Sequence, residues 1–267
     1  MTARIEDDIP EDVYHSGPEL SASGAKVLLR NPARYQYERT HPRPSTDAMD
    51  VGSVAHHLIL HRGGRLHIID AYDWRKKADQ ETRDRLRAEG VVVIHRGQLR
   101  DAARMARAVR QHPLASAILI DGKPEVSIYW HEEVHHEDGS SSVVPCRARV
   151  DWLRDNAIVD VKTTAREASP TGFAKVSADF SYHWSAAHYV TAVERATGKR
   201  LPFLLIAVEK DHPHYVSVHQ FDDSFLDIGT ERMAEAYALF ARCEASGEWP
   251  TPVPDDQINT LTPPRWL

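Results

Sequence analysis

The sequence predicts an α/β protein in which a central mixed β-sheet is flanked by helices and joined to a mainly helical N-terminal part. Three patterns predict this class. Helical spacing of apolar residues dominates 1–120, alternating strand-like segments gather in 121–222, and a long amphipathic helix followed by a Pro-rich tail occupies 223–267. We expect all three parts to belong to one domain spanning 1–267.

Helix signals dominate the N-terminal part. Ser21 or Ser23 can cap a helix that ends near Arg30, and Pro32 separates it from a second helix. Asp50 can cap the next one, whose apolar residues form a buried stripe. The other expected elements are a loop at 41–50, a helical or partly mobile segment at 74–88, a strand at 91–94 and a helix at 97–113.

Strand signals begin at residue 125, where apolar and polar residues alternate. A polar turn is expected at 132–141, before the chain returns as a second strand. The expected elements are strands at 125–131 and 143–153, a hairpin at 149–164, a helix at 181–196, strands at 202–210 and 214–221, and a helix at 223–246.

The segment RVDWLRDNAIVDVKTT, residues 149–164, predicts a tight β-hairpin with Asp155 and Asn156 in its turn. The register pairs Asp151 with Asp160, Trp152 with Val159, and Val150 with Val161. One face then carries Val150, Trp152, Val159 and Val161, and the other carries Arg149, Asp151, Asp160 and Lys162.

Two carboxylates placed directly across a strand pair repel each other. A divalent cation between Asp151 and Asp160 would relieve that repulsion, and hard oxygen ligands suit magnesium or manganese. The alternative is a solvated hairpin face that carries an ordinary Asp–Lys pair. The hairpin therefore suggests a metal site, and motifs elsewhere in the chain must decide between the two interpretations.

Composition narrows the classes of function. A net charge of −6 argues against a protein that coats nucleic acid nonspecifically, and two cysteines are too few for a disulfide framework. The histidine-rich segments 131–136 and 211–219 lack the spacing of zinc sites. With an acidic start and no membrane-length apolar run, the sequence predicts a soluble, cytoplasmic protein with no membrane partner.

Several motifs together resemble one nuclease superfamily. VDVKTT with Asp151 upstream resembles the PD-(D/E)xK signature. Gly52 and His56 resemble the Gly-x-x-x-His helix of RecB-like nucleases, with His57 as an ambiguous neighbour. YHWSAAHY resembles the Gln-x-x-x-Tyr helix of that family: Tyr189 matches, but Ser185 stands where glutamine is expected. LSASGAKVLLRNPARYQY and the Pro-rich tail resemble the ends of phage RecE-type exonucleases.

This resemblance implies a restriction-endonuclease-like core and a magnesium-dependent exodeoxyribonuclease, with manganese as a possible substitute. Such an enzyme would digest one strand of linear duplex DNA from its 5′ end. The 3′ overhang would serve a RecT-like single-strand annealing protein in homologous recombination. The resemblance also implies a homo-oligomeric ring that holds the DNA end.

The resemblance assigns roles to individual residues. It implies that Asp151, Asp160, His56 and the carbonyl of Val161 bind the metal, and that Lys162 orients water or stabilises developing charge. Glu125 would support these ligands or bind a second metal. Tyr189, beside the substituted Ser185, would contact DNA. Positive charge near the N-terminus, including Lys26, Arg30 and Arg34, could meet DNA phosphates or belong to solvated helix faces.

Three other interpretations remain open. A restriction-type or repair endonuclease could use the same core. Ser23 and Lys26 match the Ser-x-x-Lys of penicillin-recognising acyl enzymes, but the Ser-Asp-Asn and Lys-Thr-Gly partners are absent and Ser23 can instead cap a helix. A noncatalytic DNA-binding protein of the same fold is the third, and the intact Asp-x-Lys argues against it.

Overall fold

The computed structural model describes residues 3–41, 44–136, 138–253, 256 and 258–263. The strands are β1 (Arg4–Glu6), β2 (Leu66–Ile69), β3 (Val92–His95), β4 (Lys123–His135), β5 (Ser141–Leu153), β6 (Ile158–Thr164), β7 (Phe203–Glu209) and β8 (Val216–Gln220). The helices are α1 (Glu11–Ser16), α2 (Ala22–Arg30), α3 (Pro32–Thr40), α4 (Asp47–Leu60), α5 (Lys77–Ala88), α6 (Arg96–Gln111), α7 (Pro113–Ile118), α8 (Pro170–Asp179), α9 (Tyr182–Thr197) and α10 (Asp223–Ser246).

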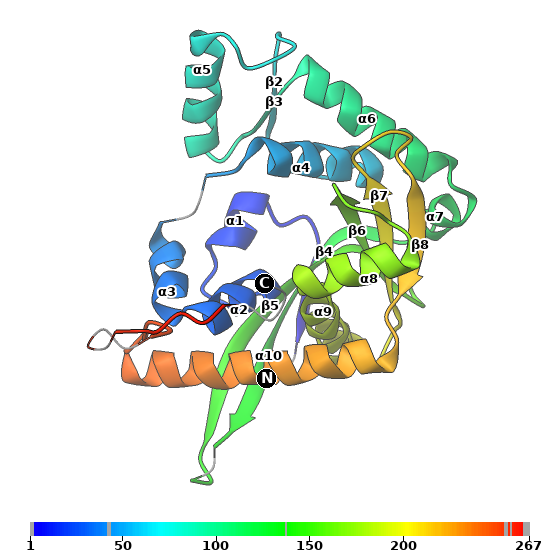
Figure 1. Ribbon diagram of the computed structural model, residues 1–267. Helices are drawn as coiled ribbons and strands as arrows, with labels where there is room; N and C mark the ends of the chain where they lie inside the picture. Colours follow the sequence, from blue (N-terminus) through cyan, green and yellow to red (C-terminus); the bar gives the residue numbers. More distant parts are fainter. Residues whose placement is uncertain (1–2, 42–43, 137, 254–255, 257, 264–267) are drawn as a thin grey trace.

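A six-stranded mixed sheet forms the centre of the molecule, in the order β1-β4-β5-β6-β7-β8 (Figure 1). β6 and β7 run parallel, and the other neighbouring pairs are antiparallel. β2 and β3 make a separate parallel pair. The β4–β5 hairpin is long and projects past α10. The predicted α/β class with a central mixed sheet flanked by helices is confirmed.

The two faces of the sheet carry separate hydrophobic clusters. On one face, Leu28, Val190 and Phe240 from α2, α9 and α10 pack with Leu205. On the other, Val54 and Met105 from α4 and α6 pack with Val159 and Ile206. Side chains alternate between the faces along β6, so this strand is covered on both sides. Its charged residues, Asp160 and Lys162, therefore lie within the helical layers.

Several helix limits follow directly from local signals. Ser21 caps α2, since its hydroxyl accepts a hydrogen bond from the Gly24 amide. Asn31 caps α3, which begins at Pro32 as predicted. Asp222 caps α10, and Gly247 ends it in the left-handed conformation that glycine tolerates best. The last helix therefore has the predicted bounds, 223–246.

Three predicted boundaries are wrong. Thr46 caps α4, which begins at Asp47, whereas Asp50 is buried inside the helix and paired with Arg87. The polar turn predicted at 132–141 is too long, because β4 continues to His135 and β5 begins at Ser141. The helix predicted at 97–113 ends at Gln111, because Pro113 starts α7. Five short elements were not predicted: β1, β2, α1, α7 and α8.

The hairpin register is confirmed next to the turn, where Trp152 pairs with Val159 and Leu153 with Ile158. Further from the turn, the described residues of β5 and β6 form no more ladder pairs, so the predicted pairs Asp151–Asp160 and Val150–Val161 are wrong. The strands part here. Val150 also leaves the predicted apolar face and joins the cluster of α9 and α10.

Within the described residues, no helix combines the length and apolar character needed to cross a membrane.

Candidate active site

Asp151 and Val161 lie where β5 and β6 separate, which we call the fork. The Asp151 carboxylate spans the gap and accepts a hydrogen bond of 2.8 Å from the Val161 amide. This hydrogen bond takes the place of the backbone pairing between β5 and β6, which ends at Trp152 and Val159. Away from the turn, the two strands are therefore joined by a side-chain hydrogen bond in place of backbone pairing.

Asp160 lies at the fork on β6 and is 1% exposed. The Lys162 ammonium is 2.5 Å from its Oδ2. Neither Asp160 oxygen accepts a hydrogen bond of sound geometry from the described residues. The pKa of the Asp160 carboxyl is raised to about 6, because burial outweighs the lowering effect of Lys162 and the nearby Asp151 charge adds to the rise. The carboxylate is thus deeply desolvated and short of partners.

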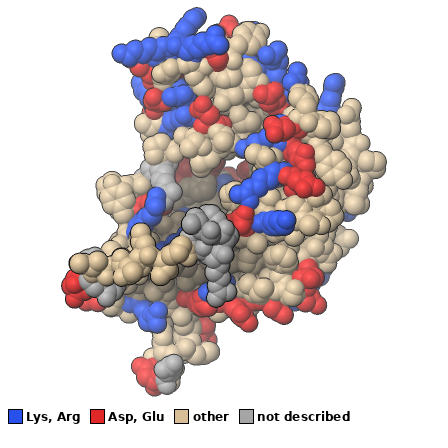
Figure 2. Space-filling view, in the orientation of Figure 1, with Lys and Arg blue, Asp and Glu red and all other residues tan. Residues whose placement is uncertain are grey.

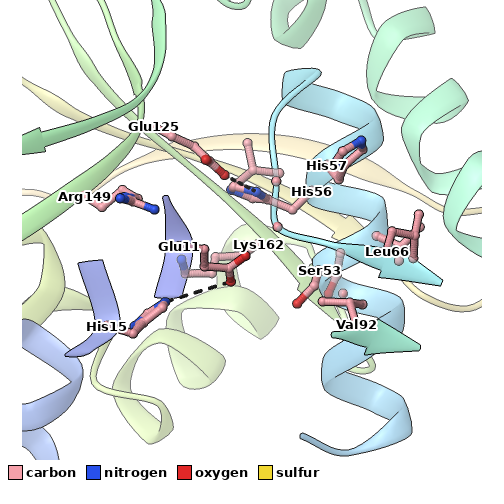
Figure 3. A pocket seen from close by; sticks show the side chains of 16 residues that line it. Glu11, His15, Ser53, His56, His57, Leu66, Val92, Glu125, Arg149 and Lys162 are labelled. Atoms are coloured by element: carbon pink, nitrogen blue, oxygen red, sulfur yellow. Dashed lines mark ion pairs between the residues drawn. The ribbon is translucent and has the colours of Figure 1, made fainter. Parts of the chain in front are cut away.

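His56 reaches the fork from α4. Its Nε2 is 3.0 Å from Asp151 Oδ2. Its Nδ1 is 3.9 Å from Glu125 Oε1, a pair marked by a dashed line in Figure 3. Burial lowers the pKa of His56, but the Asp151 carboxylate outweighs burial and leaves the pKa above its ordinary value. The same pair lowers the pKa of Asp151 against the opposing effect of burial. His56 and Asp151 therefore form an ion pair in the site.

Glycine allows α4 to approach β6 closely. A Cβ on Gly52 would stand 3.2 Å from the Thr163 hydroxyl, tighter than ordinary packing. Gly52 is one turn before His56, so this approach carries the imidazole to the fork. Glu125 sits in β4 with a positive φ of 50°, which is uncommon for a residue other than glycine. Such backbone conformations cluster at functional sites.

A cavity of about 300 Å³ opens beside the fork. Its walls include Glu11 and His15 from α1, Arg149 from β5, Glu125, His56 and Lys162 (Figure 3). Figure 2 shows a hollow in the drawn face with Lys and Arg side chains along its rim. Of the sequence-predicted residues, Glu125, His56, Val161 and Lys162 line this concave site, and Asp151 and Asp160 lie behind it, paired with His56 and Lys162.

The N-terminal cations predicted to meet DNA do not lie together. Lys26 points from α2 toward α9, where its ammonium donates 2.9 Å to the Ser185 hydroxyl and 3.1 Å to the Phe180 carbonyl. Arg30 is exposed, and Arg34 pairs with Glu38 on the surface of α3. Lys26 and Ser185 thus lie near Lys162, through the Tyr182 ring, and Arg30 and Arg34 lie on the surface.

Tyr189 packs beneath the site. It is half-buried on α9, and its ring centroid lies 6.2 Å from that of Phe203. Burial raises the pKa of its hydroxyl, with the charges of Asp160 and Asp151 adding to the rise. Its predicted contact with DNA stays a prediction.

Sequence reasoning missed several residues of the site. The Tyr182 ring lies 5.4 Å from the Lys162 ammonium and 5.7 Å from that of Lys26. Tyr182 precedes Ser185 by three residues and Tyr189 by seven, so helical spacing could have placed it on their face. Arg149, Glu11 and His15 were also missed, although Arg149 shares the predicted polar face of the hairpin.

The residues at the fork suit a divalent cation in their chemistry. Asp160 is a buried carboxylate whose oxygens lack sound hydrogen bonds, and Asp151, His56 and Glu125 offer further oxygen and imidazole donors. In the described part of the chain, no three His, Cys, Asp or Glu side chains are gathered as a ready-made cage. Lys162 and His56 instead supply the positive charge that these carboxylates need.

The mixed sheet, the acid at the end of β5, the Asp-x-Lys on β6 and the helical histidine together define a PD-(D/E)xK nuclease core. The model of one family, the PDDEXK-like domain of unknown function (DUF3799), matches residues 21–255. The chain belongs to this family. Nucleases with this core generally depend on a divalent metal. No curated protein matches the sequence.

Two solved structures were compared with this fold. The crystal structure of a candidate exonuclease from Eubacterium rectale has a TM-score of 0.62 at 15% sequence identity, and the match covers 97% of each chain. The crystal structure of SSO0001 has a TM-score of 0.40 at 11% identity and covers 84% of this chain and 77% of that chain. The first likeness shows that the fold is shared across nearly the full length.

Proposed function

We propose that the protein is a magnesium-dependent exodeoxyribonuclease that degrades one strand of linear duplex DNA, from the 5′ end. The fork carries this proposal, because Asp151 pairs with His56 and Asp160 pairs with Lys162, and both His56 and Lys162 line one cavity. The 3′ overhang that remains would serve a RecT-like annealing protein in recombination. The exonuclease candidate with the same fold and the sequence resemblance to RecE-type enzymes both favour removal of nucleotides from an end.

Asp151, Asp160, His56 and the Val161 carbonyl would hold the metal, which would polarise the scissile phosphate and lower the pKa of a bound water. Glu125 is the further acid within reach of His56. Lys162 is held between Asp160 and the Tyr182 ring, and its ammonium borders the cavity. It would stabilise charge on a phosphate oxygen as the bond breaks.

The size of the cavity bears on the substrate. A space of about 300 Å³ is at the small end of ligand pockets, and it fits a short stretch of one strand better than a whole double helix. We infer that one strand leaves the duplex to bring its phosphate to Lys162. Separation of strands is easiest at a DNA end, which favours an exonuclease over an enzyme that cuts within intact duplex.

Substrates of different topology test this function. Linear duplex, nicked circular and supercoiled DNA are incubated with the protein in magnesium, in manganese and in chelator, and end-labelled strands report polarity. We expect the linear duplex to shorten from its 5′ ends, the supercoiled circle to persist, and chelator to stop degradation. Linearisation of the supercoiled circle would instead support an endonuclease, and persistence of all three DNAs would refute a nuclease.

A further inference from the structure

Lys26 is a second lysine close to Lys162, beside the same tyrosine ring and next to the candidate active site. Its ammonium is fixed by the Ser185 hydroxyl at 2.9 Å and the Phe180 carbonyl at 3.1 Å. An ammonium group has three N–H donors, so two of them are used by these neighbours. Ser185, where the family helix would carry glutamine, thus supplies the hydroxyl that holds the Lys26 ammonium.

Lys26 and Lys162 converge on one aromatic ring. Their ammonium groups lie 5.7 Å and 5.4 Å from the centroid of Tyr182. Lys162 forms an ion pair with the Asp160 carboxylate. Among the described residues, no carboxylate lies at ion-pair distance from Lys26. Burial, followed by the Lys162 charge, lowers the pKa of Lys26 to about 7. A buried cation beside a like charge is costly unless an anion joins it.

We infer that Lys26 binds a backbone phosphate of the DNA strand that is being cut, next to the phosphate that meets Lys162. This rests on the proposed function. The third N–H of Lys26 makes a charge-assisted hydrogen bond to that phosphate, while Ser185 and the Phe180 carbonyl keep the ammonium in place. The anion also relieves the repulsion between Lys26 and Lys162. Ser185 is a positioning residue that acts through Lys26.

A purely structural role would have different consequences. If Lys26 only tied α2 to the segment before α9, its loss would lower the melting temperature and leave the salt dependence of DNA binding unchanged. A contact to one phosphate instead contributes about one unit to the slope of log Kd against log salt. The slope therefore separates the two roles, even in a variant that is somewhat less stable.

The test measures the binding of a short linear duplex with frayed ends, at several salt concentrations, in chelator so that nothing is cut. Lys26→Met keeps the aliphatic stem, and Lys199→Met, an exposed lysine after α9, is the matched control. We expect Lys26→Met to raise Kd about tenfold and to reduce the salt slope by about one. Lys199→Met should match the wild type. With magnesium, Lys26→Met should raise KM more than it lowers kcat.

Neutral DNA linkages provide a second measurement. Single methylphosphonates are placed in turn along the strand near its 5′ end. One position should weaken binding to the wild type and have no further effect in Lys26→Met. If Lys26→Met does not fold, Ser185→Ala is measured in its place. We expect Ser185→Ala also to raise Kd and reduce the salt slope, by smaller amounts. Unchanged slope and Kd in a folded Lys26 variant, or equal sensitivity of wild type and variant to every linkage, would overturn the inference.

Failure of the proposed function would look different. The wild type would then neither bind the duplex end nor degrade it in magnesium, and the Lys26 inference would fall with it. If the wild type cuts DNA and Lys26→Met binds with the same Kd and slope, only the role of Lys26 is refuted.

Discussion

Burial of the Asp160 carboxylate away from water lowers the stability of the folded protein. Its carboxyl has a pKa of about 6 when folded, compared with 3.8 for an unperturbed Asp, so the folded state binds this proton more tightly. Stability from this residue is therefore highest below about pH 4 and falls as pH rises through about 6. A bound cation would offset this loss of stability. Residues that serve function often destabilise the folded protein in this way when their ligand is absent.

Replacing Asp160 with asparagine should stabilise the metal-free protein at pH 7.5. The neutral amide avoids burying a charge, and a shift from 3.8 to about 6 corresponds to about 3 kcal/mol, or a rise of about 8 °C in the melting temperature. Thermal unfolding in chelator between pH 4 and 8 measures this. The gap between variant and wild type should widen as pH rises through 6, and an asparagine variant less stable than wild type at pH 7.5 would contradict the desolvation argument.

Single residues at the site were predictable to different degrees. Asp151, Asp160 and Lys162 stand out in sequence because a hairpin turn is local, and its register follows from the turn residues and strand alternation. The side-chain bond from Asp151 to the Val161 amide was not predictable, because it forms only where the strands part. The contact of the Lys26 side chain with Ser185 was not predictable either, because it depends on how α2 packs near α9.

At the scale of elements, long amphipathic segments with local caps were predicted, and short ones were not. The bounds of α10 follow from its apolar spacing, the Asp222 cap and Gly247. β1 has three residues and is held by its pairing with β4, a contact distant in sequence. β2 and β3 similarly depend on each other. Such short elements carry too little periodicity to outweigh their tertiary context.

A buried ion pair between α4 and α5 holds the helix that carries His56 in place. Asp50 in α4 is 1% exposed, and it accepts a hydrogen bond of 2.8 Å from the Arg87 side chain of α5. Arg87 also reaches Asp47 at 2.5 Å. Removal of the arginine would leave a buried carboxylate without its partner, which costs far more than loss of a surface pair.

Arg87→Met should therefore destabilise the protein by about 3 kcal/mol. The double variant Asp50→Leu with Arg87→Met should recover most of this loss, because no buried charge remains. Arg85→Met, which removes an exposed pair with Glu89, is the matched control and should change stability by less than about 0.5 kcal/mol. Denaturant unfolding measures all three, and equal effects of Arg85→Met and Arg87→Met would contradict the anchoring role of the buried pair.

At the scale of the whole molecule, we expect a closed homo-oligomer that surrounds the DNA end. The resemblance to RecE-type exonucleases motivates this proposal, and cyclic symmetry is the usual way for identical chains to close on themselves. Light scattering at micromolar concentration should give a mass that is a multiple of the 30.2 kDa chain. A strict monomer that degrades long DNA without dissociating would refute it.

The central claim is that the fork hydrolyses DNA, and the rate of nucleotide release from a linear duplex in magnesium tests it most directly. Wild type is compared with Asp160→Asn, with Lys162→Met, and with Asp155→Asn as a control in the exposed turn of the same hairpin. Both fork variants should stay folded and lose at least about a hundredfold in rate, whereas Asp155→Asn should match wild type. An Asp160→Asn variant as active as wild type would contradict the claim.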